Sequence, residues 1–182
     1  ILGLEKSKEE TTYLFIDSPG GSVFDGLALV NYLQTTDKKI VCIAKYAVSM
    51  AHAILQSCTT RLGTVSNLLM QHRVTSRAEG NSLQINDQAQ TMIRLQFFMD
   101  VMESARIGIS VEEFVRRATN NWTTFGSESV SENLLDGLVT VACSPVLYTK
   151  ETRKEVRSLF GSGTIVTNGC PLIPAVVERD NR

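Results

Sequence analysis

The chain has 182 residues, of which 43% are hydrophobic and 20% are charged, and its net charge is −1. This balance is that of an ordinary globular protein with a sizeable core. The near-zero charge argues against nucleic acid or an anionic membrane surface as a partner. No apolar run approaches the roughly 20 residues that a membrane-spanning helix needs. We therefore expect neither a nucleic-acid partner nor a membrane partner.

The first half of the chain alternates short apolar runs with helical patterns. The apolar runs predict buried strands over Tyr13–Asp17, Ile40–Ala44 and Asn67–Gln71. Between them, one helix is expected from the N-cap Ser22 to about Gln34, and a second over 49–57. Residues 45–48 are expected to form a short turn.

The second half begins with a polar loop over 73–81, after which residues 82–107 predict one long helix. A capping box at Ser110 opens a short helix through Ala118, and residues 134–139 resemble a turn into a last strand. This alternation predicts an α/β fold with a mostly parallel sheet and a long projecting helix. Such folds carry their sites at the carboxyl ends of the strands.

The composition changes after residue 143, so we expect one domain over 1–143 and an extension over 144–182. Residues 150–160 predict a charged amphipathic helix, and Gly161-Ser162-Gly163 predicts a linker. An apolar tail with Pro171 and Pro174 follows.

The four cysteines, Cys42, Cys58, Cys143 and Cys170, form no CxxC pair and no metal-ligand spacing. We expect buried free thiols in a reducing compartment, and hence a cytoplasmic protein. With only two histidines in the chain, a histidine-rich metal site is not expected. Nothing in the sequence calls for a metal or another cofactor.

A glycine-rich turn, Ser18-Pro19-Gly20-Gly21-Ser22, lies between the first strand and the first helix. Glycines leave backbone amides open to a ligand, and helix N-terminal amides favour negative charge. An oxyanion hole needs both properties, although a plain tight turn has the same pattern.

Ser49 lies at the next strand-to-helix turn, where small neighbours leave room for a substrate carbonyl. The amide of Met50 is a second candidate oxyanion donor. Ser49 is therefore a candidate nucleophile, with a simple helix N-cap as the alternative. A serine needs a general base before it attacks at neutral pH.

His72 is our first candidate for that base, because it follows a buried strand that holds it rigidly. His52 is the competitor, but its place within a helix points it toward neighbouring turns, as for a packed or hydrogen-bonded residue. Asn121, Asn120 and, in third place, Asp136 are candidates to orient the imidazole.

Three segments resemble the ClpP family of serine peptidases, within the ClpP/crotonase-like superfamily. They are YLFIDSPGGSV from Tyr13, AVSMAHAIL from Ala47 and LMQH from Leu69, and the likeness extends over about residues 1–142. It implies a superhelix of repeated β-β-α units, with Ser49 as nucleophile and His72 as base. Where the family has its catalytic aspartate, this chain has Asn120-Asn121-Trp122.

The resemblance also implies a homo-oligomeric ring that hydrolyses peptides or unfolded proteins. Some members of the family work with an ATPase partner. The N-terminal loop that they use has no counterpart here, so the sequence gives little support for such a partner. Two alternatives stay open: a crotonase-type acyl-CoA enzyme, which shares the oxyanion hole, and an inactive subunit that only assembles.

Overall fold

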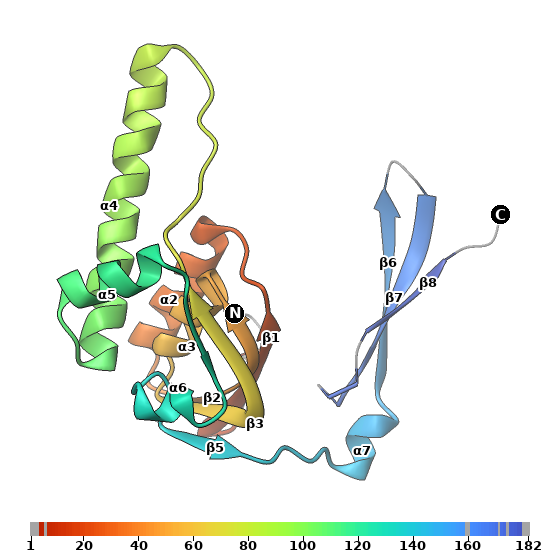
Figure 1. Cartoon of the computed structure of the whole chain (residues 1–182). Coiled ribbons are helices and arrows are strands. Elements are labelled where there is room, and N and C mark those ends of the chain that lie inside the picture. The colour runs from red at the N-terminus through yellow and green to blue at the C-terminus, as the bar shows by residue number, and fades with distance from the viewer. Residues whose placement is uncertain (1–3, 6, 159–160, 171, 174, 180–182) are drawn as a thin grey trace. The chain divides into compact units, whose positions relative to one another are not determined.

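A computed structural model describes residues 4–5, 7–158, 161–170, 172–173 and 175–179. The chain divides into two compact units, Ile1–Thr140 and Val141–Arg182, which are described separately below (Figure 1). Among the residues the structure describes, no helix has both the length and the apolar character that a bilayer crossing requires.

The first unit is built on a five-stranded sheet in the order β1-β2-β3-β4, with β5 pairing with β3. The strands are β1 (Thr11–Ser18), β2 (Lys39–Val48), β3 (Thr60–Gln71), β4 (Trp122–Phe125) and β5 (Gly137–Val139). Strands β1, β2, β3 and β5 pair in parallel, whereas β4 runs antiparallel to β3. The predicted α/β fold with a mostly parallel sheet is therefore confirmed, and β4 is an element that the sequence did not reveal.

The helices of the first unit are α2 (Val23–Thr35), α3 (Met50–Gln56), α4 (Ser82–Ile107), α5 (Val111–Thr119) and the short α6 (Glu128–Ser131). Helices α2 and α5 begin at the capping residues that the sequence predicted, whereas α6 was not predicted. Ser22 caps α2 by accepting from the amide of Asp25. The side chain of Ser110 caps α5 by accepting a hydrogen bond from the backbone amide of Glu113. The side chain of Glu113 accepts from Arg116 and Arg117 rather than from the backbone amide of Ser110.

The three strands predicted in the first half are all longer than their apolar runs, β2 and β3 by five residues or more. The turn expected over 45–48 is wrong, because β2 continues to Val48 through a register shift between Ala44 and Tyr46. Strand β3 begins at Thr60 rather than Asn67, since its first half pairs with both β2 and β5. Pairing with neighbouring strands thus extends each strand beyond its local hydrophobic signal.

The main core lies between the sheet and α3, and it includes Ile40, Ala47, Leu55 and Leu69, each fully buried. The small side chain of Ala51 brings α3 close to the strands, whereas Ala53 packs in a second cluster with Val30 of α2 and Met99 of α4. Because α3 follows Ser49 directly, this packing fixes the turn that carries Ser49.

The expectation of free thiols is wrong. Cys42 on β2 is bonded to Cys58 after α3, and Cys143 is bonded to Cys170 in the second unit. Cys42 and Cys58 are buried as expected. Burial alone does not predict a disulfide, because the two thiols meet only when the fold brings their segments side by side. Because disulfides persist in oxidising compartments, the argument from cysteines for a cytoplasmic location no longer holds.

Helix α4 extends beyond the rest of the first unit (Figure 1). Its buried residues all lie in its second half, from Gln96 to Ile107. The first half presents exposed apolar side chains to solvent, including Leu83 and Ile93. The long projecting helix expected from the sequence is confirmed.

The second unit is a three-stranded antiparallel sheet in the order β6-β7-β8, preceded by the short helix α7 (Pro145–Tyr148). Its strands are β6 (Glu151–Ser158), β7 (Gly161–Asn168) and β8 (Val176–Arg179). The amphipathic helix expected over 150–160 is wrong, as is the linker over 161–163, because β6 pairs with β7 along its whole length. Pro171 and Pro174 lie outside the described residues.

Candidate active site

The candidate site lies at one edge of the sheet of the first unit. Strands β1, β2 and β3 are parallel, so their carboxyl ends meet at the same edge. Gly20 follows β1, Ser49 follows β2 and His72 follows β3. The topology therefore brings together the three segments that the sequence singled out.

Ser49 has an unusual backbone conformation for a non-glycine residue, with φ 58° and ψ −125°. Its amide donates to the carbonyl of Met70 on β3 at 2.9 Å, and its hydroxyl caps no amide of α3. The simple N-cap alternative therefore has no support in the hydrogen bonding. A strained residue of this kind, at the start of a helix and between two strands, is typical of a functional position.

Gly20 packs directly against the Ser49 turn. A Cβ on Gly20 would lie 2.7 Å from the carbonyl oxygen of Val48 and 2.8 Å from Cβ of Ser49. Gly20 also has φ +97°, which side chains rarely adopt. Glycine is therefore required here by both conformation and space, and the glycine-rich turn is more than a tight turn between two elements.

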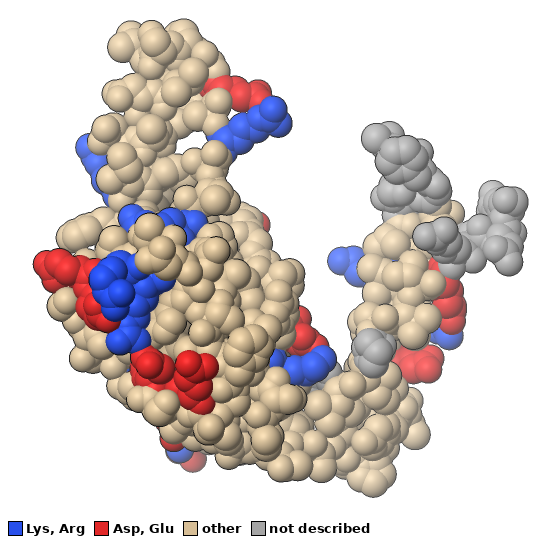
Figure 2. All heavy atoms as spheres, in the orientation of Figure 1, with Lys and Arg blue, Asp and Glu red and all other residues tan. Residues whose placement is uncertain are grey.

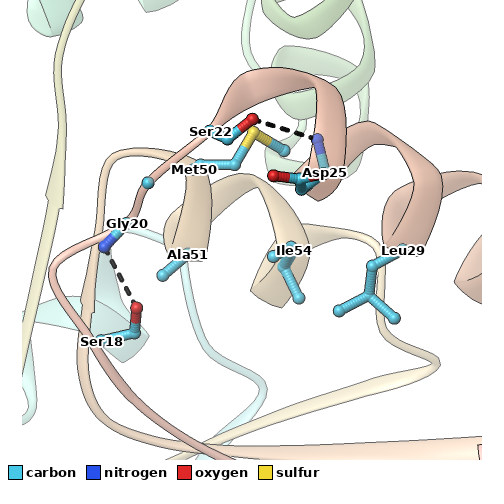
Figure 3. Close-up of a pocket in the computed structure, with 10 residues that line it drawn as sticks. Ser18, Gly20, Ser22, Asp25, Leu29, Met50, Ala51 and Ile54 are labelled. Atoms are coloured by element: carbon cyan, nitrogen blue, oxygen red, sulfur yellow. Dashed lines mark hydrogen bonds between the residues drawn. The ribbon is translucent and has the colours of Figure 1, made fainter. Parts of the chain in front are cut away.

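The three predicted oxyanion residues are not equivalent. The amide of Gly20 donates to Oγ of Ser18 at 3.2 Å, as the dashed line in Figure 3 shows. Met50 is the first residue of α3, so its amide has no partner within the helix. Gly21 has φ +155° and open space around its Cα. The amides of Gly21 and Met50 are therefore better placed than that of Gly20 to receive an oxyanion.

A pocket of about 240 Å³ opens beside this turn, between α2 and α3 (Figure 3). Apolar walls come from Leu29 on α2 and from Met50, Ala51 and Ile54 on α3. Asp25 and the backbone of the glycine-rich turn form its polar rim. A mostly apolar pocket with a few polar groups is the usual shape of a binding site.

His72 is half-buried, and its ring is held by the backbone. Nδ1 lies 2.7 Å from the carbonyl oxygen of Arg73. A carbonyl oxygen only accepts, so Nδ1 must carry the proton, and in the neutral ring Nε2 is then the free acceptor. A general base toward a serine hydroxyl needs this tautomer.

Ser49 and His72 are close in the strand register. Val48 pairs with Met70, so Ser49 lies beside the last residues of β3, immediately before His72. No hydrogen bond joins the Ser49 hydroxyl to the imidazole of His72 among the described residues. Such bonds are often absent until a substrate is bound.

His52, the competing base, is engaged elsewhere. It is 1% exposed, and its Nδ1 lies 2.6 Å from a carboxylate oxygen of Glu103 on α4. The interpretation of His52 as a packed, hydrogen-bonded helix residue is confirmed.

The candidates for a third member lie at different distances from His72. Gln71 pairs with Trp122 on β4, so the antiparallel ladder, continued by one residue, sets Asn121 opposite His72. Asn121 has φ +55°, and the structure records no side-chain bond from it to the imidazole. Asn120 donates instead to the carbonyl of Arg116.

Asp136 belongs to a different part of the fold. Its carboxylate binds the buried Arg61 through Nη2 at 2.6 Å and the Arg61 amide at 2.7 Å, near the start of β3. His72 follows the opposite end of that strand. Arg61 pairs with Cys42 and Met70 with Val48, so the six residues between these partners on β2 already separate the two ends by about 20 Å. Burial alone would raise the pKa of Asp136, but the hydrogen bonds from Arg61 outweigh it and lower that pKa. Asp136 therefore does not orient the histidine.

Sequence reasoning missed three residues at this edge: Arg73, Gln71 and Glu103. The sequence gives no signal for the Arg73 carbonyl, because every residue has a backbone carbonyl. Gln71 and Glu103 are buried polar residues at positions where apolar ones are usual. That departure from the hydrophobic pattern was the available clue.

The chain is similar to known proteins over most of its length. Residues 1–142 match the family model described as Clp protease. The ATP-dependent Clp protease proteolytic subunit 1 of Synechococcus sp. (strain CC9902) is 30% identical over 137 residues, which cover 72% of this chain and 68% of the relative.

Two further relatives have similar names and similar coverage. Proteolytic subunit 3 of Rhodococcus jostii (strain RHA1) is 27% identical over 129 residues, which cover 69% of this chain and 64% of the relative. The proteolytic subunit of Borreliella afzelii (strain PKo) is 28% identical over 132 residues, with 70% and 66% covered.

Proposed function

Because the chain belongs to the Clp protease family, we propose that it is a serine peptidase with Ser49 as nucleophile and His72 as general base. One observation carries this proposal above all. Ser49 stands in a strained turn at the carboxyl end of β2, hydrogen-bonded to β3 just before His72 and packed against Gly20.

In the proposed reaction, Oγ of Ser49 attacks the carbonyl carbon of a peptide bond while Nε2 of His72 takes the hydroxyl proton. The carbonyl oxygen becomes an oxyanion that the amides of Gly21 and Met50 stabilise. The C–N bond then breaks, and the imidazolium gives its proton to the leaving amine. A water molecule, activated by the same nitrogen, hydrolyses the acyl-enzyme and frees Ser49.

The hydrogen bond from Nδ1 of His72 to the carbonyl of Arg73 supports this assignment, because it selects the tautomer that the base needs. We further propose Asn121 as the third member of the site, on the basis of its place opposite His72 in the ladder. An amide there adds no charge to the imidazolium that forms during attack. The enzyme is therefore expected to be slower than one with a carboxylate.

We propose peptides or unfolded polypeptides as substrates, binding in extended form along the glycine-rich turn after the edge strand β1. The apolar pocket beside Met50 would then receive a substrate side chain. A homo-oligomer that contacts through α4 is also part of the proposal. The relatives are named as proteolytic subunits of an ATP-dependent protease, yet no residue of this chain by itself calls for an ATPase, so we leave that partner out of the proposal.

The proposal is tested by labelling with a fluorophosphonate probe and by peptide hydrolysis. We expect the probe to modify Ser49, and we expect Ser49→Ala to lower kcat by about a thousandfold or more while the fold is kept. Ser57→Ala, at the other end of α3, is the control and should retain labelling. Near-normal turnover in a folded Ser49→Ala protein would overturn the proposal, and so would labelling at another serine.

A further inference from the structure

A buried polar strip runs along α4 where this helix meets the body of the first unit. Gln96, Asp100 and Glu103 follow one another at spacings of four and three residues, so they share one face of the helix. They are 7%, 2% and 0% exposed. An apolar row is the usual choice for such a face, and buried polar groups require hydrogen-bonding partners.

The partners of this strip lie in the short segment that contains His72. Each of the three side chains accepts a hydrogen bond of 2.5 Å from this segment. Glu103 accepts from Nε2 of Gln71, Asp100 accepts from Nη1 of Arg73, and Gln96 accepts from the backbone amide of Val74. Helix α4 therefore holds residues 71–74 by three separate bonds, on both sides of the proposed base.

Gln71 transmits the contact from Glu103 to His72. Its Oε1 accepts from the backbone amide of His72 at 3.0 Å, while its Nε2 donates to Glu103. A carboxylate only accepts and a backbone amide only donates, so the side-chain amide of Gln71 has one allowed orientation. Glu103 thus fixes Gln71, and Gln71 fixes the backbone of His72.

The same carboxylate also reaches the helix that follows Ser49. The second oxygen of Glu103 binds Nδ1 of His52 at 2.6 Å, and both side chains are buried. Nε2 of His52 is buried without a partner, so a proton there would be unsatisfied, and the arrangement favours Nδ1–H as the donor. One carboxylate therefore connects the helix that follows Ser49 to the strand end before His72.

We propose that Glu103 is a positioning residue, which acts through Gln71 to hold the imidazole of His72 and through His52 to hold the start of α3 beside it. The expected effect of Glu103 on the rate of peptide hydrolysis rests on the proposed function. The effect of Glu103 on the placement of His72 does not depend on activity.

The test compares two identical exchanges at buried glutamines. Gln71→Met removes the link between Glu103 and His72. Gln56→Met is the matched control, because Gln56 is equally buried but bonds to Arg61 and the carbonyl of Leu134. We expect the two variants to lose similar thermal stability. Only Gln71→Met should lower kcat, by about tenfold with KM little changed, because misplacement of a reacting group acts on the chemical step.

A second variant tests the carboxylate itself. An amide at position 103 offers one acceptor to two donors, so Glu103→Gln should also lower kcat by about tenfold. Because Gln71 and Glu103 act in one chain, the double variant should be no slower than the slower single variant. Additive losses in the double variant would contradict the linked arrangement.

Imidazole NMR signals of histidine-labelled protein provide the readout that is independent of activity. The chain has only two histidines, so the signals of His72 are readily assigned. We expect them to shift or broaden in Gln71→Met and to stay unchanged in Gln56→Met. Equal kcat values and equal His72 signals in the two variants would overturn the inference. If the unmodified protein neither reacts with the probe nor hydrolyses peptides, the proposed function fails, and the His72 signals still decide the positioning role.

Discussion

At the scale of single residues, Gly20 is where two of the three site segments touch. A methyl group there would come within 3 Å of the Val48 carbonyl and of the Ser49 side chain, in a conformation that alanine avoids. We expect Gly20→Ala to destabilise the protein by about 2 to 4 kcal/mol and to abolish labelling of Ser49. Gly21→Ala is the control, because no atom lies within 4 Å of its added Cβ.

The comparison should be made by denaturant unfolding and by probe labelling on the same samples. Because Gly21 also has a positive φ, some loss of stability is expected there. A Gly20→Ala protein as stable and reactive as Gly21→Ala would contradict the close packing at the Ser49 turn.

Asn121 is the residue that we propose as the third member of the site, and its role stays a prediction. We expect Asn121→Asp to raise kcat several-fold, up to about tenfold, because a carboxylate opposite His72 would stabilise the imidazolium. Steady-state kinetics on Asn121→Asp, Asn121→Ala and Asn120→Asp would decide it, with Asn120→Asp expected to have no effect. If no exchange at Asn121 alters turnover, the Arg73 carbonyl alone orients the imidazole.

At the scale of elements, an ion pair closes the end of the sheet opposite to the site. Arg61 on β3 is 2% exposed, and Asp136 before β5 supplies its carboxylate partner. Asp136→Asn would leave a buried guanidinium without a counter-charge. We expect a loss of about 2 to 3 kcal/mol at pH 7, less than for a fully buried pair, because Asp136 is 33% exposed.

The same pair predicts a dependence of stability on pH. The pKa of Asp136 is lowered in the folded state, where the hydrogen bonds from Arg61 outweigh the effect of burial. Its contribution is therefore complete above the ordinary pKa of an aspartate and is lost as the pH falls through the lowered value. Urea unfolding between pH 7 and pH 2 should show a shallower acid loss in Asp136→Asn. Asp37→Asn, in an exposed connection, should follow the unmodified protein.

At the scale of the whole molecule, helix α4 has more exposed apolar surface than a monomer needs. Ile93, Phe97 and Phe98 are 59%, 63% and 50% exposed, and the projecting part of the helix is largely uncharged on the face in Figure 2. Apolar patches of this kind mark contacts between proteins. Closed homo-oligomers bury them by symmetry.

We therefore expect light scattering to give a mass several times that of the 20.1 kDa chain. The double exchange Ile93→Glu and Phe97→Glu, one turn apart, should reduce that mass. Val65→Glu replaces another exposed apolar residue away from α4 and is the control for the added charge. A monomer at micromolar concentration, or an assembly unchanged by the α4 exchange, would contradict the prediction.

The sequence by itself determined the approximate positions of β1 to β3 and α2 to α5, and the edge of the sheet at which the candidate site lies. The signals for Ser22, Gly20 and the apolar run before His72 are local, because they come from capping, from glycine and from hydrophobic patterning. The tertiary structure decided which distant groups meet. It paired Cys42 with Cys58, His52 with Glu103 and Arg61 with Asp136, and it built β4 and the sheet of the second unit. Contacts of this kind depend on segments brought together only by the folded chain, and no short stretch of sequence encodes them.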